Sequence, residues 1–331
     1  MRKRLLDLLA CPLCGGPLTL DATSERGDHI IEGTLACGCG KRYPIVDAVP
    51  RLLIGDDQAP VAFRRLQERT QRSFGHQWTT FGKMVEMFRE DLLNYTGLRS
   101  EFFQGKVGLD AGCGFGRHLF YAASFGAEVV GMDLSSAVDQ AFRHVKDLSN
   151  AHIVQGDIYH PPFRKEAFDL IYSIGVLHHL PDPEGGFRAL LPFLKPGGSV
   201  LIWVYSRSRR WTNTALEAVR LFTSRLPFRA LKALSFLGAA VDWAFFIGPY
   251  KAAVKRRALQ PLAEALTFPR VKLYARYPFQ VSYADWFDRL SAPIRFYFDE
   301  EDLLRWAERA RLQHVRISPT GRYGLRLYGE T

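Results

Sequence analysis

Three acidic residues follow hydrophobic runs at places where a carboxylate could bind a charged, hydroxylated ligand. Asp110 ends the run VGLD, Asp133 ends EVVGMD, and Asp157 ends AHIVQGD. A carboxylate at Asp110 would attract an amino group or a sulfonium and would repel a pyrophosphate. Asp133 can accept hydrogen bonds from two ribose hydroxyls, and Asp157 can accept one from the exocyclic amine of adenine. Together these acids predict a site for an adenosine that carries positive charge.

The loop after the first acid has glycines at every second position, Gly112, Gly114 and Gly116. A dinucleotide-binding loop has the pattern GxGxxG, which would need a glycine where this chain has Arg117. The spacing therefore argues against a nicotinamide coenzyme. Cys113 lies inside the loop and has no obvious base beside it, so we interpret it as a small residue in a crowded turn rather than a nucleophile.

Alternating strand-like and helix-like segments from Lys106 onward must position these acids. The expected strands fall at residues 107–110, 128–133, 151–157, 168–174 and 199–205, and resume at 314–318 and 323–329 after a helix at 299–310. This alternation requires a parallel sheet with helices on both faces. Because open parallel sheets bind ligands at the carboxyl ends of their strands, the three acids are expected to converge there.

Five motifs follow one another over about a hundred residues of this region: DAGCGFGR (110–117), VVGMDLS (129–135), GDIYHPPF (156–163), FDLIYSIGVLHHLPDP (168–183) and LLPFLKPGGSVLIWV (190–204). In this order they closely resemble the class I S-adenosylmethionine-dependent methyltransferases, in particular their type 11 subfamily. The resemblance implies an enzyme with a doubly wound, seven-stranded, mostly parallel sheet. A doubly wound domain whose glycines merely make turns is the alternative.

The resemblance also implies S-adenosyl-L-methionine as the cofactor. The residues expected to contact it are Asp110, Gly112, Gly114, Phe115, Gly116, Asp133, Leu134, Asp157, Ile158 and Ser173. The segment FGHQW is similar to one that precedes this fold in related methyltransferases and forms part of a lid there. Its Phe74, His76, Gln77 and Trp78 are candidates for cofactor or substrate contact, and ordinary aromatic packing is the alternative.

Methyl transfer is an in-line displacement, so the enzyme mainly has to align a nucleophile behind the methyl group and exclude water. If that nucleophile must lose a proton, His178 or His179, just after the fourth expected strand, could accept it. The alternative is that one histidine packs near the helix that begins at Asp182 while the other only shapes the pocket. Proximity in sequence does not decide between these roles.

Four cysteines near the N-terminus, Cys11, Cys14, Cys37 and Cys39, form two close pairs. Four thiolates in this arrangement favour a tetrahedral structural zinc with no open position for substrate. The stretch resembles the zinc-ribbon family that activates tRNA and protein methyltransferases. That family spaces its second pair as CxxC, whereas this chain has CxC, so an empty ribbon is the alternative to a zinc-loaded one.

The chain of 331 residues can hold about two domains with large cores. We expect a zinc ribbon at 1–55, a helical linker and lid region at 56–104, the methyltransferase domain at 105–205 and 281–331, and a helical insert after the fifth strand at 206–280. The apolar stretch Leu5–Ala10 is too short for an export signal, which favours the cytoplasm.

The expected insert accounts for the net positive charge of the chain. The formal net charge of the chain is +10, and between Tyr205 and Gln280 fourteen Lys and Arg stand against three Asp and Glu. These basic residues flank the apolar runs ALSFLGAAV and WAFFIGPY. The pattern indicates a cap over a small lipophilic substrate, or a segment that touches an anionic membrane from the cytoplasmic side; a homodimer interface is the alternative.

A second function remains open at this point, in which the ribbon and the basic insert direct the enzyme to a macromolecule such as tRNA or a protein. Nucleic acid is disfavoured because no aromatic RNA-reading motif is recognisable and the basic residues alternate with leucine and phenylalanine. The sequence does not identify the acceptor atom.

Overall fold

The computed structural model describes residues 1–55, 60–321 and 323–331. The first four residues of the expected linker, 56–59, lie outside the described residues. The chain divides into two compact units, which we call the sheet unit (Met1–Arg210 with Ile294–Thr331) and the helical unit (Trp211–Pro293). The helical unit follows the fifth strand of the large sheet, as expected for an insert, and runs on to Pro293.

The N-terminal ribbon is a four-stranded antiparallel sheet in the order β1-β2-β3-β4. Its strands are β1 (Leu18–Arg26), β2 (His29–Cys37), β3 (Arg42–Val46) and β4 (Val49–Pro50), preceded by a short 3-10 helix at Lys3–Asp7. Alternate residues of β3 are buried, namely Tyr43 and Ile45, as expected for a strand with one solvent-exposed face.

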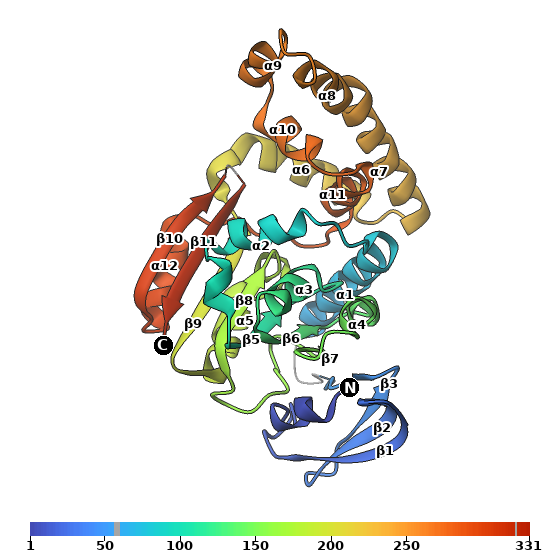
Figure 1. Ribbon diagram of the computed structural model, residues 1–331, viewed down its shortest axis with the longest axis vertical. Coiled ribbons are helices and arrows are strands. Elements are labelled where there is room, and N and C mark those ends of the chain that lie inside the picture. Colours follow the sequence, from blue (N-terminus) through green and yellow to red (C-terminus); the bar gives the residue numbers. More distant parts are fainter. Residues whose placement is uncertain (56–59, 322) are drawn as a thin grey trace. The chain divides into compact units, whose positions relative to one another are not determined.

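The large sheet has seven strands in the order β10-β11-β9-β8-β5-β6-β7 (Figure 1). Strands β9, β8, β5, β6 and β7 pair in parallel, and β11 is antiparallel to both of its neighbours. The bounds are β5 (Val107–Ala111), β6 (Glu128–Asp133), β7 (Ala151–Gln155), β8 (Phe168–Ile174), β9 (Leu194–Tyr205), β10 (Gln313–Thr320) and β11 (Gly324–Glu330). The expected doubly wound, mostly parallel sheet is confirmed.

Helices cover both faces of this sheet, and each face has its own core. One core joins Leu109 and Val130 to the helices α5 and α12, and the other joins Leu170 and Val129 to α2, α3 and α4. The helices of the sheet unit are α1 (Val61–Phe81), α2 (Phe88–Thr96), α3 (Arg117–Ser124), α4 (Ala137–Val145), α5 (Pro183–Leu190) and α12 (Glu300–Arg309), with a 3-10 turn at Ser100–Phe103.

Helix α5 begins where Asp182 caps it, because the Asp182 carboxylate accepts a hydrogen bond from Gly185 N at 2.9 Å. It ends at Leu190, and the chain tightens into a 3-10 turn around Pro192, which has no backbone N–H for a longer α-helix. Strand β9 then starts at Leu194, five residues before the expected start at Ser199. The strand therefore includes the KPGG sequence.

The ribbon is joined to the large sheet by backbone hydrogen bonds as well as by side chains. Leu52 N donates to Gln155 O at 2.9 Å, and Arg51 forms a parallel bridge with Gln155 at the end of β7. Arg51 also pairs with the carboxylate of Asp139 on α4. Because buried leucines of the ribbon, such as Leu5 and Leu9, belong to the same hydrophobic core as β6 and β7, the ribbon is an integral layer of the sheet unit.

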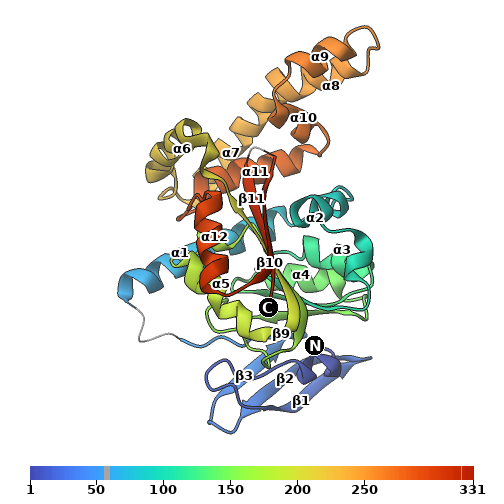
Figure 2. The ribbon, with the colours of Figure 1, turned by 90° about the vertical axis from the view of Figure 1, so that its left-hand side faces the viewer.

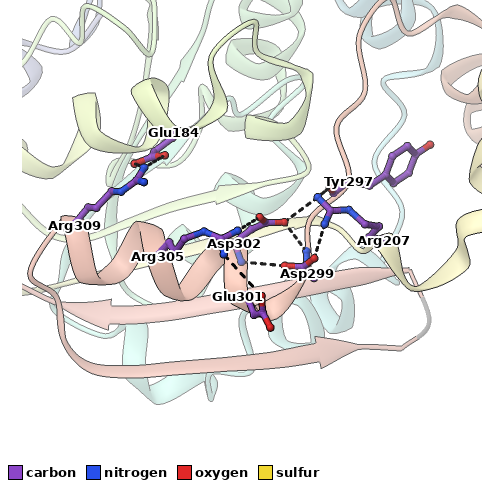
Figure 3. Close-up of polar contacts among 8 residues, drawn as sticks. All are labelled: Glu184, Arg207, Tyr297, Asp299, Glu301, Asp302, Arg305 and Arg309. Carbon is purple, nitrogen blue, oxygen red and sulfur yellow. Dashed lines mark hydrogen bonds and ion pairs between the residues drawn. The ribbon is translucent and has the colours of Figure 1, made fainter.

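The polar contacts around α12 fix the return of the chain to the sheet unit (Figure 3). Asp299 and Asp302 form a reciprocal capping box, with Asp302 N donating to Asp299 at 3.0 Å. Arg207, just after β9, donates to both carboxylates and to the carbonyl of Tyr297. The chain segments that lead into and out of the helical unit therefore both contact the N-terminus of α12.

The helical unit has no strand among its described residues and is built around two packed helices (Figure 2). Helix α7 packs so closely on α11 that a Cβ on Gly238 would lie 2.7 Å from the ring of Trp286. Its elements are α6 (Arg210–Thr223), α7 (Phe228–Asp242), a π-turn (Trp243–Ile247), α8 (Gly248–Val254), α9 (Gln260–Leu266), α10 (Pro269–Ala275) and α11 (Phe279–Ser291).

Candidate functional site

A pocket of about 120 Å³ opens at the carboxyl ends of the parallel strands in the sheet unit. Its walls come from the loops after β5, β6, β7 and β8 and from one face of α1. The lining residues are Thr70, Gln71, Phe74, Trp78, Gly112, Cys113, Gly114, Phe115, Arg117, His118, Asp133, Leu134, Ser135, Asp157, Ile158, Ile174, Gly175, Val176, His179 and Leu180. Seven of the ten residues expected to contact the cofactor are among them, and Asp110, Gly116 and Ser173 are not.

The glycine loop forms the floor of the pocket and needs its glycines for two reasons. Gly112 and Gly114 have φ values of +87° and +54°, a region that other residues adopt at a cost. A Cβ at Gly112 would also lie 2.5 Å from Val176, and one at Gly114 would lie 3.3 Å from the ring of Trp78. The loop is therefore closed around the pocket on two sides, with no room for larger residues.

Asp133, at the end of β6, is held as an acceptor on the pocket wall. Its Oδ1 accepts from Ser135 N at 2.8 Å and from Ser135 Oγ at 2.7 Å, and its Oδ2 accepts from Gly114 N at 2.9 Å. Burial raises its pKa, and these donors oppose that rise. The carboxylate is thus fixed in one orientation before any ligand arrives.

Asp110 lies behind the glycine loop and is 2% exposed. Its Oδ2 has no hydrogen-bond partner among the described residues. Burial, reinforced by the charge of Asp133, raises the pKa of this carboxyl to about 8, although Arg117 pulls it down. A buried acid in this state gains most from a nearby cation, because the cation stabilises the charged form that burial disfavours.

Asp157 contacts helix α1 across the pocket. Its Oδ2 accepts from Gln67 Nε2 at 2.6 Å, and its Oδ1 accepts from Tyr159 N at 3.0 Å. One turn further along α1, Gln71 Nε2 donates to the carbonyl of Leu134 at 2.9 Å. These two glutamines were not predicted as site residues. The pattern that could have identified them is their spacing of four residues, which places them on the same helix face.

The two candidate bases lie in different surroundings. His179 lines the pocket, its ring centroid is 4.7 Å from that of Phe74, and its Nδ1 lies 2.7 Å from the carbonyl oxygen of Ile294. A carbonyl can only accept, so Nδ1 carries the hydrogen, and the neutral ring has its lone pair on Nε2. His179 therefore lines the pocket with Nδ1 bound to a backbone carbonyl.

His178 is not among the residues that line the pocket and is fully buried, with its ring 3.9 Å from that of Tyr205. Burial lowers the pKa of His178 well below its usual value, and the charges of His179 and Arg295 lower it further. The prediction left both histidines as candidates, and the geometry favours only His179. His178 matches the alternative of a packed histidine.

Some of the other residues expected to contact ligand line the pocket, and others do not. Phe74 and Trp78 of the FGHQW segment line the pocket, whereas Gln77 is buried outside its lining. Ser173 donates to the carbonyl of Ala111 at 2.7 Å and thereby links β8 to β5. Burial raises the pKa of Cys113 well above its usual value, which agrees with a packing residue and disfavours a nucleophile.

The four ribbon cysteines come together as expected. Their sulfur atoms all lie within 4.8 Å of one another, with 3.8 Å between Cys11 and Cys39 and 3.5 Å between Cys14 and Cys37. Zinc–sulfur bonds of about 2.3 Å in a tetrahedron place sulfur atoms roughly 3.8 Å apart, so the cluster fits a zinc ion. The CxC spacing does not prevent this, because the turn after β2 brings Cys39 back beside Cys11.

Comparison with known proteins agrees with both sites. The model of a family described as "Methyltransferase domain" matches residues 109–202, and that of a family described as "Trm112p-like protein" matches residues 2–47. The chain carries a Trm112p-like domain followed in sequence by a methyltransferase domain. The first match spans the whole glycine loop and the acids, and the second contains all four cysteines.

Individual relatives share the methyltransferase domain. Phosphoethanolamine N-methyltransferase 3 of Arabidopsis thaliana is 38% identical over 107 residues, which is 31% of this chain and 22% of that protein. A tRNA U34 carboxymethyltransferase of Pseudoalteromonas translucida is 36% identical over 150 residues, 39% of this chain and 46% of that protein. The chain thus matches less than half of the length of either relative.

Among solved structures, phosphoethanolamine N-methyltransferase 2 of Haemonchus contortus, in complex with phosphomonomethylethanolamine and S-adenosylhomocysteine, is 16% identical. The match has a TM-score of 0.47 and covers 82% of this chain and 61% of that one.

The residues of the methyltransferase domain fit S-adenosylmethionine. Asp133 offers fixed carboxylate oxygens to a ribose diol, and Asp157 offers an acceptor for an adenine amine. The unpartnered oxygen of Asp110 supplies the negative charge that an amino group or a sulfonium requires. In the Trm112p-like domain, the four thiols can hold a structural zinc.

Proposed function

We propose that the chain transfers a methyl group from S-adenosylmethionine to a small, lipophilic acceptor. One observation carries the proposal: three separate segments of the matched stretch, the glycine loop, Asp133–Ser135 and Asp157–Ile158, converge on a single pocket in the sheet unit. A catalytic candidate, His179, lines the same pocket. Cofactor, acceptor and base can therefore meet in one place.

S-adenosylmethionine, when bound, supplies an electrophilic methyl group. The chain's own part is to position the acceptor in line with that methyl group and to keep water out. Aromatic rings of Phe74, Trp78 and Phe115 enclose one side of the pocket. His179 Nε2 accepts the proton that a hydroxyl or amine acceptor loses as its oxygen or nitrogen takes the methyl group.

The lining of the pocket favours a small acceptor with apolar parts. Beyond the acids, its wall near His179 consists of Ile174, Val176 and Leu180 with the ring of Phe74. Such side chains gain free energy by covering apolar surface. The name of the Arabidopsis thaliana relative, a phosphoethanolamine N-methyltransferase, also supports a small-molecule acceptor.

A second candidate is methylation of a macromolecule, because the Trm112p-like match and the tRNA carboxymethyltransferase relative both point in that direction. In that case the ribbon and the basic helical unit would contact tRNA or protein. The two candidates share the pocket and the base and differ only in the acceptor.

The discriminating experiment gives the purified chain radiolabelled S-adenosylmethionine together with total lipid, total RNA or total protein from cells that lack the gene. We expect label in the lipid fraction, and no label with a His179→Ala variant. Label in the RNA or protein fraction would establish the second candidate. Absence of label in every fraction, with an intact protein, would contradict methyl transfer to any of these classes.

A further inference from the structure

The helical unit exposes an unusual share of large hydrophobic side chains. Of the twenty such side chains that are exposed in the described parts of the chain, fifteen belong to this unit, which is about a quarter of the chain. They are Val219, Leu221, Phe222, Leu226, Leu234, Phe236, Leu237, Val241, Phe245, Phe246, Leu259, Leu262, Leu266, Phe268 and Leu273. Exposed hydrophobic surface on this scale indicates an interaction site.

The segment 255–268, which we call the distal segment, concentrates this exposure. Leu262 and Leu266 are 58% and 73% exposed and stand four residues apart on α9, so they share one face, and Phe268 just beyond the helix is 72% exposed. The segment has one acid, Glu264, to which the side chain of Gln260 donates. Glu264 is thus a single exposed acid beside the apolar row, against three basic residues at the start of the segment.

Positive charge lies at the start of the same segment. Lys255, Arg256 and Arg257 are all exposed and form no ion pair within the described residues. Over the whole unit, twelve Lys and Arg stand against five Asp and Glu. Most of those acids are already engaged inside the unit: Arg270 pairs with Asp242 at 2.6 Å and Arg289 with Asp285 at 2.6 Å. The unpaired charge at the surface is thus almost entirely cationic.

The unit has a packed interior of its own beneath the exposed row. Asp242 accepts from Arg270 and from Trp286 Nε1 at 2.7 Å, while Phe287 and Leu231 are buried between the helices. The continuous helical stretch Phe228–Val254 is also long and apolar enough to cross a membrane by length and composition, and only 28% of its most apolar window is buried. The unit therefore exposes apolar side chains in addition to those that form its interior.

We infer that the helical unit binds the surface of an anionic lipid bilayer, with the distal segment entering the headgroup region. Leu262, Leu266 and Phe268 reach the acyl boundary, and Lys255, Arg256 and Arg257 contact anionic headgroups. A second copy of the chain would bring a surface of the same charge, and nucleic acid would leave the leucines uncovered. This binding does not depend on the proposed methyl transfer, because none of its residues belongs to the pocket.

Vesicle flotation of the full chain tests this inference. We expect the protein to float with phosphatidylcholine vesicles that contain one quarter phosphatidylglycerol, to float far less with pure phosphatidylcholine, and to dissociate as salt is raised. The variant Lys255→Gln/Arg256→Gln/Arg257→Gln should partition on the order of a hundredfold more weakly, since each basic residue near an anionic surface contributes about fivefold. The variant Leu262→Ser/Leu266→Ser/Phe268→Ser should lose about tenfold or more.

Matched controls come from exposed positions of the sheet unit. Lys165→Gln/Arg188→Gln/Arg311→Gln removes the same charge, and Val46→Ser/Val61→Ser/Leu304→Ser removes the same number of exposed apolar side chains. Both should float like the parent. Flotation that neither distal variant changes, or no flotation at low salt by a folded protein, would overturn the inference. So would a dimer in solution that the distal variants dissociate while vesicles bind none of the protein. Cofactor binding measured on the same preparations shows independently whether the pocket is intact.

Discussion

Two buried aspartates show how differently the two units are built. In the helical unit, Asp242 is 8% exposed and receives hydrogen bonds from Arg270 and Trp286. In the sheet unit, Asp110 is 2% exposed and has an oxygen with no hydrogen-bond partner in the described chain. A buried polar group without a partner costs stability, so an unpaired acid beside a pocket indicates a place for a ligand.

The same contrast extends to the whole of each unit. The sheet unit holds groups that a cation would satisfy, namely the acids near the glycine loop and the four thiols of the ribbon. The helical unit satisfies its internal charges and leaves hydrophobic side chains outside. We propose that the first unit binds small cationic ligands and that the second binds an apolar surface. The experiments proposed next remove either a ligand of one unit or a residue of the chain that acts at its site.

Removal of zinc is expected to have the largest effect. Chelation should lower the free energy of unfolding by on the order of 5 kcal/mol, less than the roughly 10–16 kcal/mol of isolated zinc peptides because the ribbon core continues into the large sheet. Metal analysis together with denaturant unfolding measures this. Cys14→Ser should lose the metal and Cys113→Ser should retain it. Protein purified without chelator that contains no zinc would contradict the assignment.

Replacing His179 comes next. His179→Ala should lower kcat by about 10²–10⁴-fold while leaving cofactor affinity nearly unchanged, because the ring acts on the acceptor's proton. The matched control is His178→Ala, which removes an adjacent imidazole outside the pocket lining. We expect it to cost stability through lost packing on Tyr205 and to retain turnover. Steady-state kinetics in which the two variants behave alike would exclude a special role for His179.

A smaller effect concerns the stability cost of Asp110. The folded pKa of about 8 exceeds the usual 3.8, so between these values the folded protein binds more protons than the unfolded chain. This group therefore destabilises the free protein increasingly as pH rises from about 4 to 8. Asp110→Asn should be more stable than the parent at pH 7 by about 4 kcal/mol, and the difference should vanish below pH 4. Thermal unfolding across this pH range measures it, and a difference independent of pH would refute the explanation.

The features that could be predicted from the sequence are those carried by local patterns. Strands close to Asp110, Asp133 and Asp157 follow from the hydrophobic runs, although β7 ends at Gln155, two residues before Asp157, and the metal cluster follows from two cysteine pairs. The glycine spacing argued against a dinucleotide loop, and the need for glycine at position 112 is explained by the close approach of Val176.

Long-range contacts decided what the sequence could not. His178 and His179 are neighbours in the chain, and what separates their roles is the carbonyl of Ile294, more than a hundred residues away. The pairing of Arg51 with Gln155 also depends on the tertiary fold, since both residues lie at the ends of short strands. Gln67 and Gln71 appeared as part of a polar helix, and only the position of Asp157 shows which face of that helix meets the pocket.

The central claim, that the acids of the sheet unit bind a cationic adenosine, is tested most directly by calorimetry with S-adenosylmethionine at pH 7. The account predicts binding with release of about one proton, because a carboxyl with a pKa of about 8 must ionise beside the cation. Heats measured in buffers of different ionisation enthalpy count that proton. Asp133→Ala should weaken binding about a hundredfold, whereas Asp147→Ala, at an exposed position, should leave it unchanged. Uptake of a nicotinamide dinucleotide with no heat from S-adenosylmethionine would contradict the claim.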